Sequence, residues 1–154
     1  MLRSLSFVTL LYSATFLSAQ QQYTWDMYDL SFTLADDFEE VTNDEDEFSA
    51  MGYGMDLTIL PFHDGDIDAD DITIYTMSMA ATLELDNIGD LDVIELNDYT
   101  GAYAEGEVDG VTIFIMGLID PQSETNFFIL IAFESDDEYS IDRAVDICRS
   151  LRRV

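Results

Sequence analysis

VTIFIMGLI (residues 111–119) and FFILIAFE (127–134) are the stretches that decide the fold. A strand in a sheet covered on one face alternates apolar and polar residues, because successive side chains point to opposite faces. In the first stretch Ile113 and Ile115 alternate with Phe114, so both faces are apolar, and the second stretch behaves likewise. We therefore expect a sheet that is buried on both faces, with helices as the available cover.

Turn signals around 111–119 indicate an antiparallel meander. Asp109-Gly110 precedes this stretch and is typical of a two-residue hairpin turn. Asp120-Pro121 begins DPQSETN, a second turn that leads into the next strand. Consecutive strands joined by such short turns are expected to pair side by side.

The chain before the meander also predicts strands. Residues 93–108 are strand-like, so three or four antiparallel strands are expected between residues 93 and 134, and residues 23–61 read mainly as strands, with Pro61 ending the last of them. The acidic run TNDEDE at 42–47 predicts a solvated turn, and MGYGM at 51–55 permits a bend, a bulge or a hairpin.

Residues 70–85 predict the first of two helices. Asp68 or Asp70 is the expected N-cap, with Asp70 or Asp71 in the first turn. The β-rich run ITIYT leaves a strand start open as an alternative. The apolar residues that recur at helical spacing are Ile72, Tyr75, Met79 and Leu83.

The C-terminal segment predicts the second helix. Ser135 and Glu138 fit a capping box, and arginines occupy the last turn, which complements the helix dipole. The expected apolar stripe consists of Ile141, Ala144, Val145, Cys148 and Leu151.

The order of elements predicts one α+β domain over residues 20–154. We expect an α/β/α sandwich, in which an antiparallel β-sheet is covered by helices on both faces. The chain has 154 residues and shows no internal repeat or linker, which fits a single domain.

Residues 1–19 predict a secretory signal peptide. Arg3 gives a positive start, Leu5 to Leu17 is apolar, and Ser18-Ala19 is a small-residue exit. A membrane anchor is the alternative, but the apolar run is short for a span and contains Ser and Thr. We therefore expect an exported protein, periplasmic or extracellular, without a membrane span once the signal is removed.

The charge excludes several kinds of partner. There are 33 acidic residues against five arginines, and lysine is absent. Without Arg3 the net charge is about −29, so DNA, RNA and anionic membranes are disfavoured. Carboxylates in place of lysine resemble the composition of salt-in halophiles, which predicts adaptation to high salt, where screening relieves self-repulsion.

The run GLIDPQSETNFFILIAFES, leading into a final helix that ends DICRSL, resembles the PsbP-like fold. That fold is shared with the Ran-binding Mog family and with small exported bacterial proteins, and the resemblance covers about residues 23–153. It implies a non-enzymatic binding or assembly factor. No functional residues carry over, because no site motif of the family is present.

The acidic loop HDGDIDADD at 63–71 is a candidate cation site. Asp64, Asp66 and Asp68 stand at alternate positions, as in calcium loops. An EF-hand would need glycine at the sixth position and an acid at the twelfth, where this chain has Ala69 and Tyr75. The main expectation is therefore a solvated loop that starts the following helix, with weak Ca²⁺ or Mg²⁺ binding as the alternative and no other cofactor.

No catalytic motif stands out. His63 is the only histidine, and this composition argues against both a zinc site and a serine triad. Cys148 lies on an apolar helical stripe and predicts an inert core thiol. The sequence therefore favours a non-catalytic exported domain, adapted to high salt and monomeric, that binds or helps assemble an unknown protein partner. The alternatives are a low-affinity divalent-cation binder and a hydrolase that uses a carboxylate pair.

Overall fold

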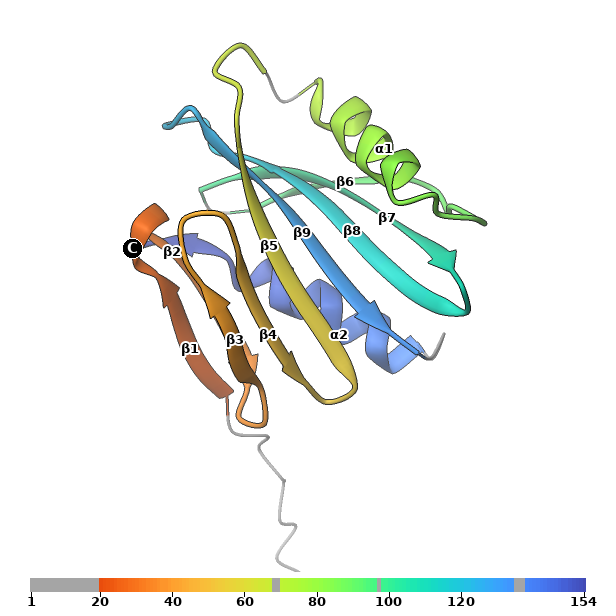
Figure 1. Ribbon diagram of the computed structural model, residues 1–154. Helices are drawn as coiled ribbons and strands as arrows, with labels where there is room; N and C mark the ends of the chain where they lie inside the picture. The colour runs from red at the N-terminus through yellow and green to blue at the C-terminus, as the bar shows by residue number, and fades with distance from the viewer. Residues whose placement is uncertain (1–19, 68–69, 97, 135–137) are drawn as a thin grey trace, which may run out of the picture.

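The computed structural model describes residues 20–67, 70–96, 98–134 and 138–154 (Figure 1). The predicted signal peptide lies outside these residues. In chain order, the elements are β1 (Gln20–Trp25), a short 3-10 helix (Asp26–Tyr28), β2 (Leu30–Ala35), β3 (Glu39–Asn43), β4 (Phe48–Gly52), β5 (Met55–His63), α1 (Ile72–Thr82), β6 (Asp92–Glu95), β7 (Thr100–Val108), β8 (Val111–Ile119), β9 (Thr125–Phe133), α2 (Glu138–Arg149) and β10 (Arg152–Arg153).

The large sheet is antiparallel, with the strand order β3-β4-β5-β9-β8-β7-β6. The hairpin predicted at Asp109-Gly110 is confirmed: both residues have positive φ, 53° and 83°, and they join β7 to β8. Positive φ at both central residues matches the right-handed twist of the flanking strands, which is why Asp-Gly favours this turn.

The two-sided burial predicted for 111–119 is confirmed. Phe114, Met116 and Leu118 point into the main core, whereas Ile115 and Ile119 pack against α1 and its neighbours on the opposite face. The sheet therefore lies between two layers, as the lack of alternation in the sequence indicated.

Helix α1 packs against β7 and β8 on one face of the large sheet (Figure 1). Gly117 lets α1 approach the sheet closely. A side chain at this position would leave no room for the helix, because an added Cβ would lie 2.5 Å from Thr76 Oγ1. The Thr76 hydroxyl donates to the Ile72 carbonyl oxygen at 2.9 Å and accepts from the Gly117 N–H at 3.2 Å. The buried centre of the helix is thus Ile72, Thr76 and Ala80, and the expected Tyr75, Met79 and Leu83 lie half-buried beside it.

The opposite face is covered by α2 together with a second, three-stranded sheet in the order β1-β2-β10. The α+β class is confirmed, but helices alone do not cover this face. The 12 residues of α2 form a rod about 18 Å long and 10 Å wide. Seven strands span about 29 Å, so the small sheet supplies the rest of the cover. The residues of the shared core with the largest side chains are Trp25, Phe32, Phe48, Phe114 and Phe127.

Residues 93–108 form two strands, β6 and β7, which pair as a hairpin, so four antiparallel strands follow α1, within the three or four expected. One boundary differs from the expectation. Pro61 does not end β5, which continues to His63 paired with β9. The pairing of β5 with β4 ends at Ile59, so Pro61 lies beyond the last residue that β4 covers. A proline is tolerated there, because no neighbouring strand on the β4 side requires a hydrogen bond from its nitrogen.

The start of α1 differs from the expected N-cap and first turn, and the expected capping box of α2 falls partly outside the described residues. Asp71 is the N-cap residue of α1, without a side-chain capping hydrogen bond, so both Asp70 and Asp71 precede the helix rather than lie in its first turn. The other expected N-cap, Asp68, lies outside the described residues, as does Ser135 of the predicted capping box. The apolar stripe of α2 is confirmed, with Ala144, Cys148 and Leu151 buried.

Candidate binding groove

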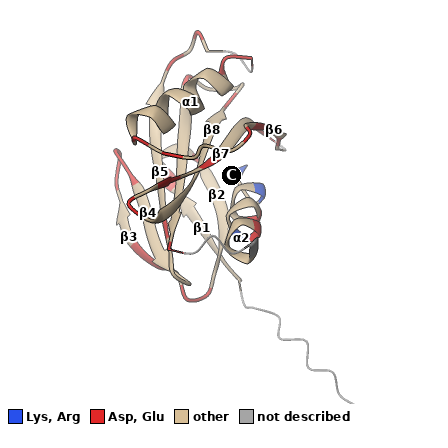
Figure 2. Ribbon diagram, turned by 90° about the vertical axis from the view of Figure 1, so that its right-hand side faces the viewer, with Lys and Arg blue, Asp and Glu red and all other residues tan. Residues whose placement is uncertain are grey.

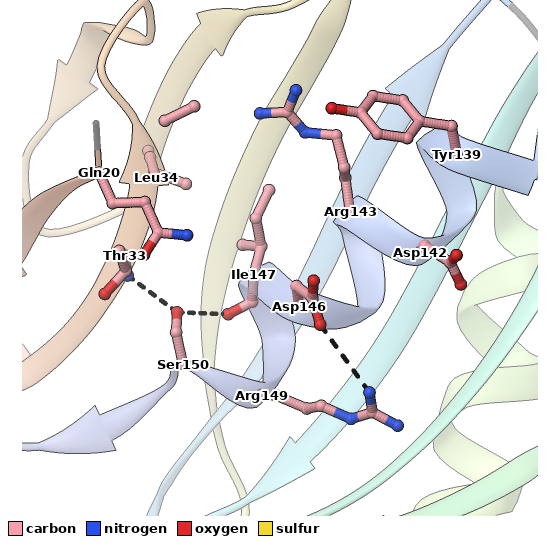
Figure 3. Close-up of a pocket in the computed structure, with 11 residues that line it drawn as sticks. Gln20, Thr33, Leu34, Tyr139, Asp142, Arg143, Asp146, Ile147, Arg149 and Ser150 are labelled. Carbon is pink, nitrogen blue, oxygen red and sulfur yellow. Dashed lines mark hydrogen bonds and ion pairs between the residues drawn. The ribbon is translucent and has the colours of Figure 1, made fainter. Parts of the chain in front are cut away.

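A groove of about 620 Å³ lies between α2 and the small sheet (Figure 3). Gln20, Thr33 and Leu34 line one side of the groove, and Tyr139 and Arg143 line the other. Its size falls in the range of about 300–1,000 Å³ that is usual for ligand sites. It is the candidate functional site because it is where positive charge meets a hollow in the surface.

Positive charge in this molecule is local. After residue 19, the basic residues are Arg143 and Arg149 on α2 and Arg152 and Arg153 on β10, whereas acidic residues are spread over the whole fold (Figure 2). A negatively charged group is repelled by most of this surface. The groove beside α2, which Arg143 and Arg149 line, is therefore one of the few places where such a group meets arginine.

Arg143 is held in place by aromatic rings. Its guanidinium carbon lies 3.8 Å from the ring centroid of Tyr53 and 5.6 Å from that of Tyr139. A cation over a ring face at these distances is attracted by the ring quadrupole. Among the side chains that the structure describes, which exclude that of Glu138, no carboxylate lies within ion-pair distance of Arg143.

Tyr53 reaches Arg143 from a tight turn between β4 and β5. Tyr53 and Gly54 both have positive φ, 54° and 71°, which makes MGYGM a hairpin and not a bulge. A bulky residue rarely adopts this conformation. The turn is fixed by Asp37, whose Oδ2 accepts from the Tyr53 N–H at 3.0 Å, and by the close approach of Gly52 to the backbone of Phe38.

Ser150 joins the end of α2 to the small sheet at one end of the groove. Its hydroxyl donates to the Ile147 carbonyl oxygen at 2.6 Å and accepts from the Thr33 N–H at 2.8 Å (Figure 3). Arg149 lies nearby in an exposed pair with Asp146 at 3.8 Å. Exposed pairs of this kind are worth about 0–1 kcal/mol, so Ser150 rather than Arg149 sets the spacing of the two walls.

In the described part of the predicted cation loop, the Asp64 side chain makes hydrogen bonds within the protein. Asp64 Oδ2 accepts from the Tyr75 hydroxyl at 2.5 Å, and Oδ1 accepts from the Asp66 N–H at 3.1 Å. The hydrogen bond to Asp64 raises the pKa of Tyr75. The Asp64 carbonyl oxygen accepts from Asn126 Nδ2 at 3.0 Å, so this residue connects α1, the end of β5 and the start of β9.

Asp68 lies outside the described residues, so the three-aspartate site stays a prediction. Within the described ranges, no group of three or more His, Cys, Asp or Glu side chains is arranged to hold a metal ion. His63 is exposed at the end of β5, where Nδ1 lies 3.1 Å from Thr125 Oγ1. Cys148 is buried, and desolvation raises the pKa of its thiol, as expected for a core cysteine.

A buried ion pair closes the fold at the C-terminus. Arg153 Nη2 pairs with Asp120 Oδ2, and the other oxygen of Asp120 accepts from the Gln122 N–H at 2.9 Å. The neighbouring Tyr99 hydroxyl is buried without a hydrogen-bond partner among the described residues. Burial, with the charge of Asp120, raises the pKa of Tyr99 to about 12, so the phenol is neutral at pH 7.

Sequence comparisons gave no relatives: the chain matches no family model and no curated protein. Solved structures are similar in fold. The Ran-binding protein Mog1p of Saccharomyces cerevisiae matches with a TM-score of 0.65 and 6% identity, over 89% of this chain and 96% of Mog1p. PsbP (CyanoP) of Synechocystis sp. PCC 6803 matches with a TM-score of 0.63 and 7% identity, over 93% and 97%.

A protein from Bacteroides thetaiotaomicron VPI-5482 matches with a TM-score of 0.56 and 11% identity, over 88% of this chain and 48% of that one. At these identities the comparison establishes the fold and nothing more. The resemblance to the PsbP-like, Mog-type fold is confirmed. In the described part of the chain, neither helix is long and apolar enough to cross a membrane.

The groove was not predicted from the sequence. The arginines were interpreted only as complements to a helix dipole, although Arg143 lies in the middle of α2, more than a turn before Arg149. That central position was the available signal for Arg143. Tyr53 gave a weaker one, since a tyrosine before glycine between two strands fits a two-residue turn with an exposed side chain.

Proposed function

We propose that this chain is a non-catalytic exported domain that binds, or helps to assemble, another protein through the groove beside α2. The observation that carries the proposal is Arg143, which is oriented by Tyr53 and has no acidic partner among the described residues although acids surround it. A preoriented guanidinium that has no acidic partner among the described side chains is suited to bind a group supplied by another molecule. Mog1p, which shares the fold, is itself a Ran-binding protein.

The acidic residues support a binding role rather than a hydrolase. Carboxylate-pair catalysis needs two converging acids, one of them with a perturbed environment. Among the described residues, Asp120 is the one acidic side chain that is buried, and it is neutralised by Arg153. With its negative charge, the domain is proposed to act as a monomer on a protein partner, without nucleic acid.

Affinity capture in molar salt tests this function. The tagged chain, incubated with the native envelope fraction, is expected to retain one partner at a fixed stoichiometry. Arg143→Gln is expected to weaken retention about tenfold, the effect of losing one charged hydrogen-bonded contact. Arg152→Gln is the matched control, because Arg152 is exposed and does not line the groove. Recovery of the chain alone, or equal retention by both variants, would contradict the proposal.

We also propose that the chain is adapted to high salt. Its net charge of −28 places many like charges within a Debye length at low ionic strength, and that length shrinks to about 3 Å at 1 M. Raising KCl from 0.1 M to 2 M is expected to increase the melting temperature by about 10 °C, equivalent to about 3 kcal/mol. Sucrose at equal osmolality controls for effects other than screening. A melting temperature that does not change with KCl contradicts the adaptation.

A further inference from the structure

Part of the edge of β2 faces the groove. On one side β2 pairs with β1 along its whole length, from Leu30 to Ala35. On the other side β10 pairs with Leu30 and Ser31 alone. Beyond that short pairing, the edge of β2 borders the space in front of α2, since Thr33, Leu34 and Ala35 line the groove.

The backbone groups that face the groove follow from the strand alternation. In an antiparallel pair, alternate residues direct both N–H and C=O to the same neighbour. Thr33 directs its N–H to Ser150, away from β1. The same alternation turns the Thr33 C=O and the Ala35 N–H toward the groove. Because the Thr33 N–H is already bonded to Ser150, these two groups are the ones with which an extended chain lying there would pair, and such a chain would lengthen the small sheet beyond Ser150.

This stretch of edge differs in charge from the outer strands of the large sheet. Strand β3 carries Glu39 and Glu40, and β6 carries Asp92 and Glu95, which discourages another strand from pairing. The stretch from Thr33 to Ala35 carries no charge. Arg143 lines the facing wall, where its donors can receive a carboxylate in bidentate geometry.

We propose that the groove binds an extended segment of the partner protein, which adds as a short strand at the Thr33 C=O and Ala35 N–H of β2, beyond Ser150, and places an Asp or Glu side chain on Arg143. This inference rests on the proposed function, because it specifies how the partner is held. Strand addition supplies affinity through the main chain, and the carboxylate fixes the register of the segment. Charge complementarity selects this occupant, since Arg143 is the groove cation without an acidic partner among the described side chains.

A peptide experiment tests the inference directly. Two libraries of amidated random octapeptides, one with a fixed central Glu and one with Gln, are selected on the purified chain in 2 M KCl. Binders are expected from the Glu library. Their affinity is expected to fall about tenfold in Arg143→Gln and to recover in part in Arg143→Lys. Replacing the peptide Glu with Gln is expected to cause no further loss of affinity in the Arg143→Gln variant, because the interaction that the double-mutant cycle measures is already absent.

N-methylation of the selected peptide tests strand addition. Methylation of alternate amides is expected to abolish binding while the amides between them tolerate it, since every second N–H faces β2. Arg152→Gln is the control, and an unchanged melting temperature in each variant excludes misfolding. Equal binding of both libraries, or a methylation scan without alternation, overturns the inference.

Two other occupants would also overturn it. Free-acid peptides that bind regardless of the internal Glu would show that Arg143 takes a C-terminal carboxylate. Dimers that sediment in the wild type and disappear in Arg143→Gln would show that a second copy of the chain fills the groove. If affinity capture still depends on Arg143 while the peptide tests fail, strand addition is wrong and the proposed function stands. If capture does not depend on Arg143, the groove itself is the wrong site.

Discussion

Replacing Asp120 with alanine is expected to lower the free energy of unfolding by about 2–3 kcal/mol. The change leaves the Arg153 guanidinium without its acid and the Gln122 N–H without its acceptor. Removing one member of a fully buried pair costs about 3–5 kcal/mol. The smaller value is expected here because 29% of the Arg153 side chain is exposed and solvent screens it. Denaturant unfolding in 2 M KCl measures the loss.

A double variant separates the ion pair from simple packing. Asp120→Leu with Arg153→Met removes both charges and is expected to be more stable than Asp120→Ala, because no charge is left buried without a partner. Asp146→Ala is the exposed control, since it removes a surface pair and is expected to cost less than about 1 kcal/mol. Equal losses in the Asp120 and Asp146 variants would show that the buried pair contributes little.

Gly117→Ala is expected to cost about 1–3 kcal/mol and to loosen α1, because overpacking a close contact forces the helix from the sheet. The added Cβ would lie 2.5 Å from Thr76 Oγ1 and 2.7 Å from Ile72 Cδ1. The hydrogen bond from the Gly117 N–H to Thr76 would be lost with the displacement. Hydrogen exchange of the α1 amides, beside denaturant unfolding, measures both effects.

Gly89→Ala is the matched control for this change. An added Cβ at Gly89 would meet its nearest atom, the Glu105 carbonyl oxygen, at 3.8 Å, an ordinary contact. The substitution is therefore expected to leave stability within about 0.5 kcal/mol, as for most surface changes. If the α1 amides of the Gly117→Ala variant exchange at the wild-type rate, the close approach of α1 to the sheet does not depend on having glycine at position 117.

The parts of the fold that were predictable are those encoded locally. Three features were readable from short stretches of sequence: the apolar residues on both faces of VTIFIMGLI, the Asp109-Gly110 turn and the apolar stripe of α2. In each case the residue pattern of one local segment predicts its structure. Strand β10 has two arginines and no apolar pattern, and its partner β2 lies about 120 residues away in the chain. The second sheet was missed because long-range pairing leaves no local signal.

The site was harder to predict for the same reason. Arg143 is oriented by Tyr53, which a turn 90 residues earlier in the chain presents. Asp64 was interpreted from its acidic neighbours in sequence, whereas its partners Tyr75 and Asn126 come from other elements. Charge and spacing therefore indicated which residues were unusual, but the contacts that give each of them a role depend on the folded topology.

The distance along the chain between β10 and its partner β2 has a consequence for the order of synthesis. Arg152 and Arg153 leave the ribosome about 120 residues after β2, yet Arg153 pairs with Asp120 and the Val154 N–H donates to the Asp29 carbonyl oxygen at 2.8 Å. The third strand of the small sheet therefore cannot join until all the other strands have been made. A nascent chain that completes its small sheet so late would stay unfolded long enough to pass through a translocation channel, which suits the export proposed for this protein.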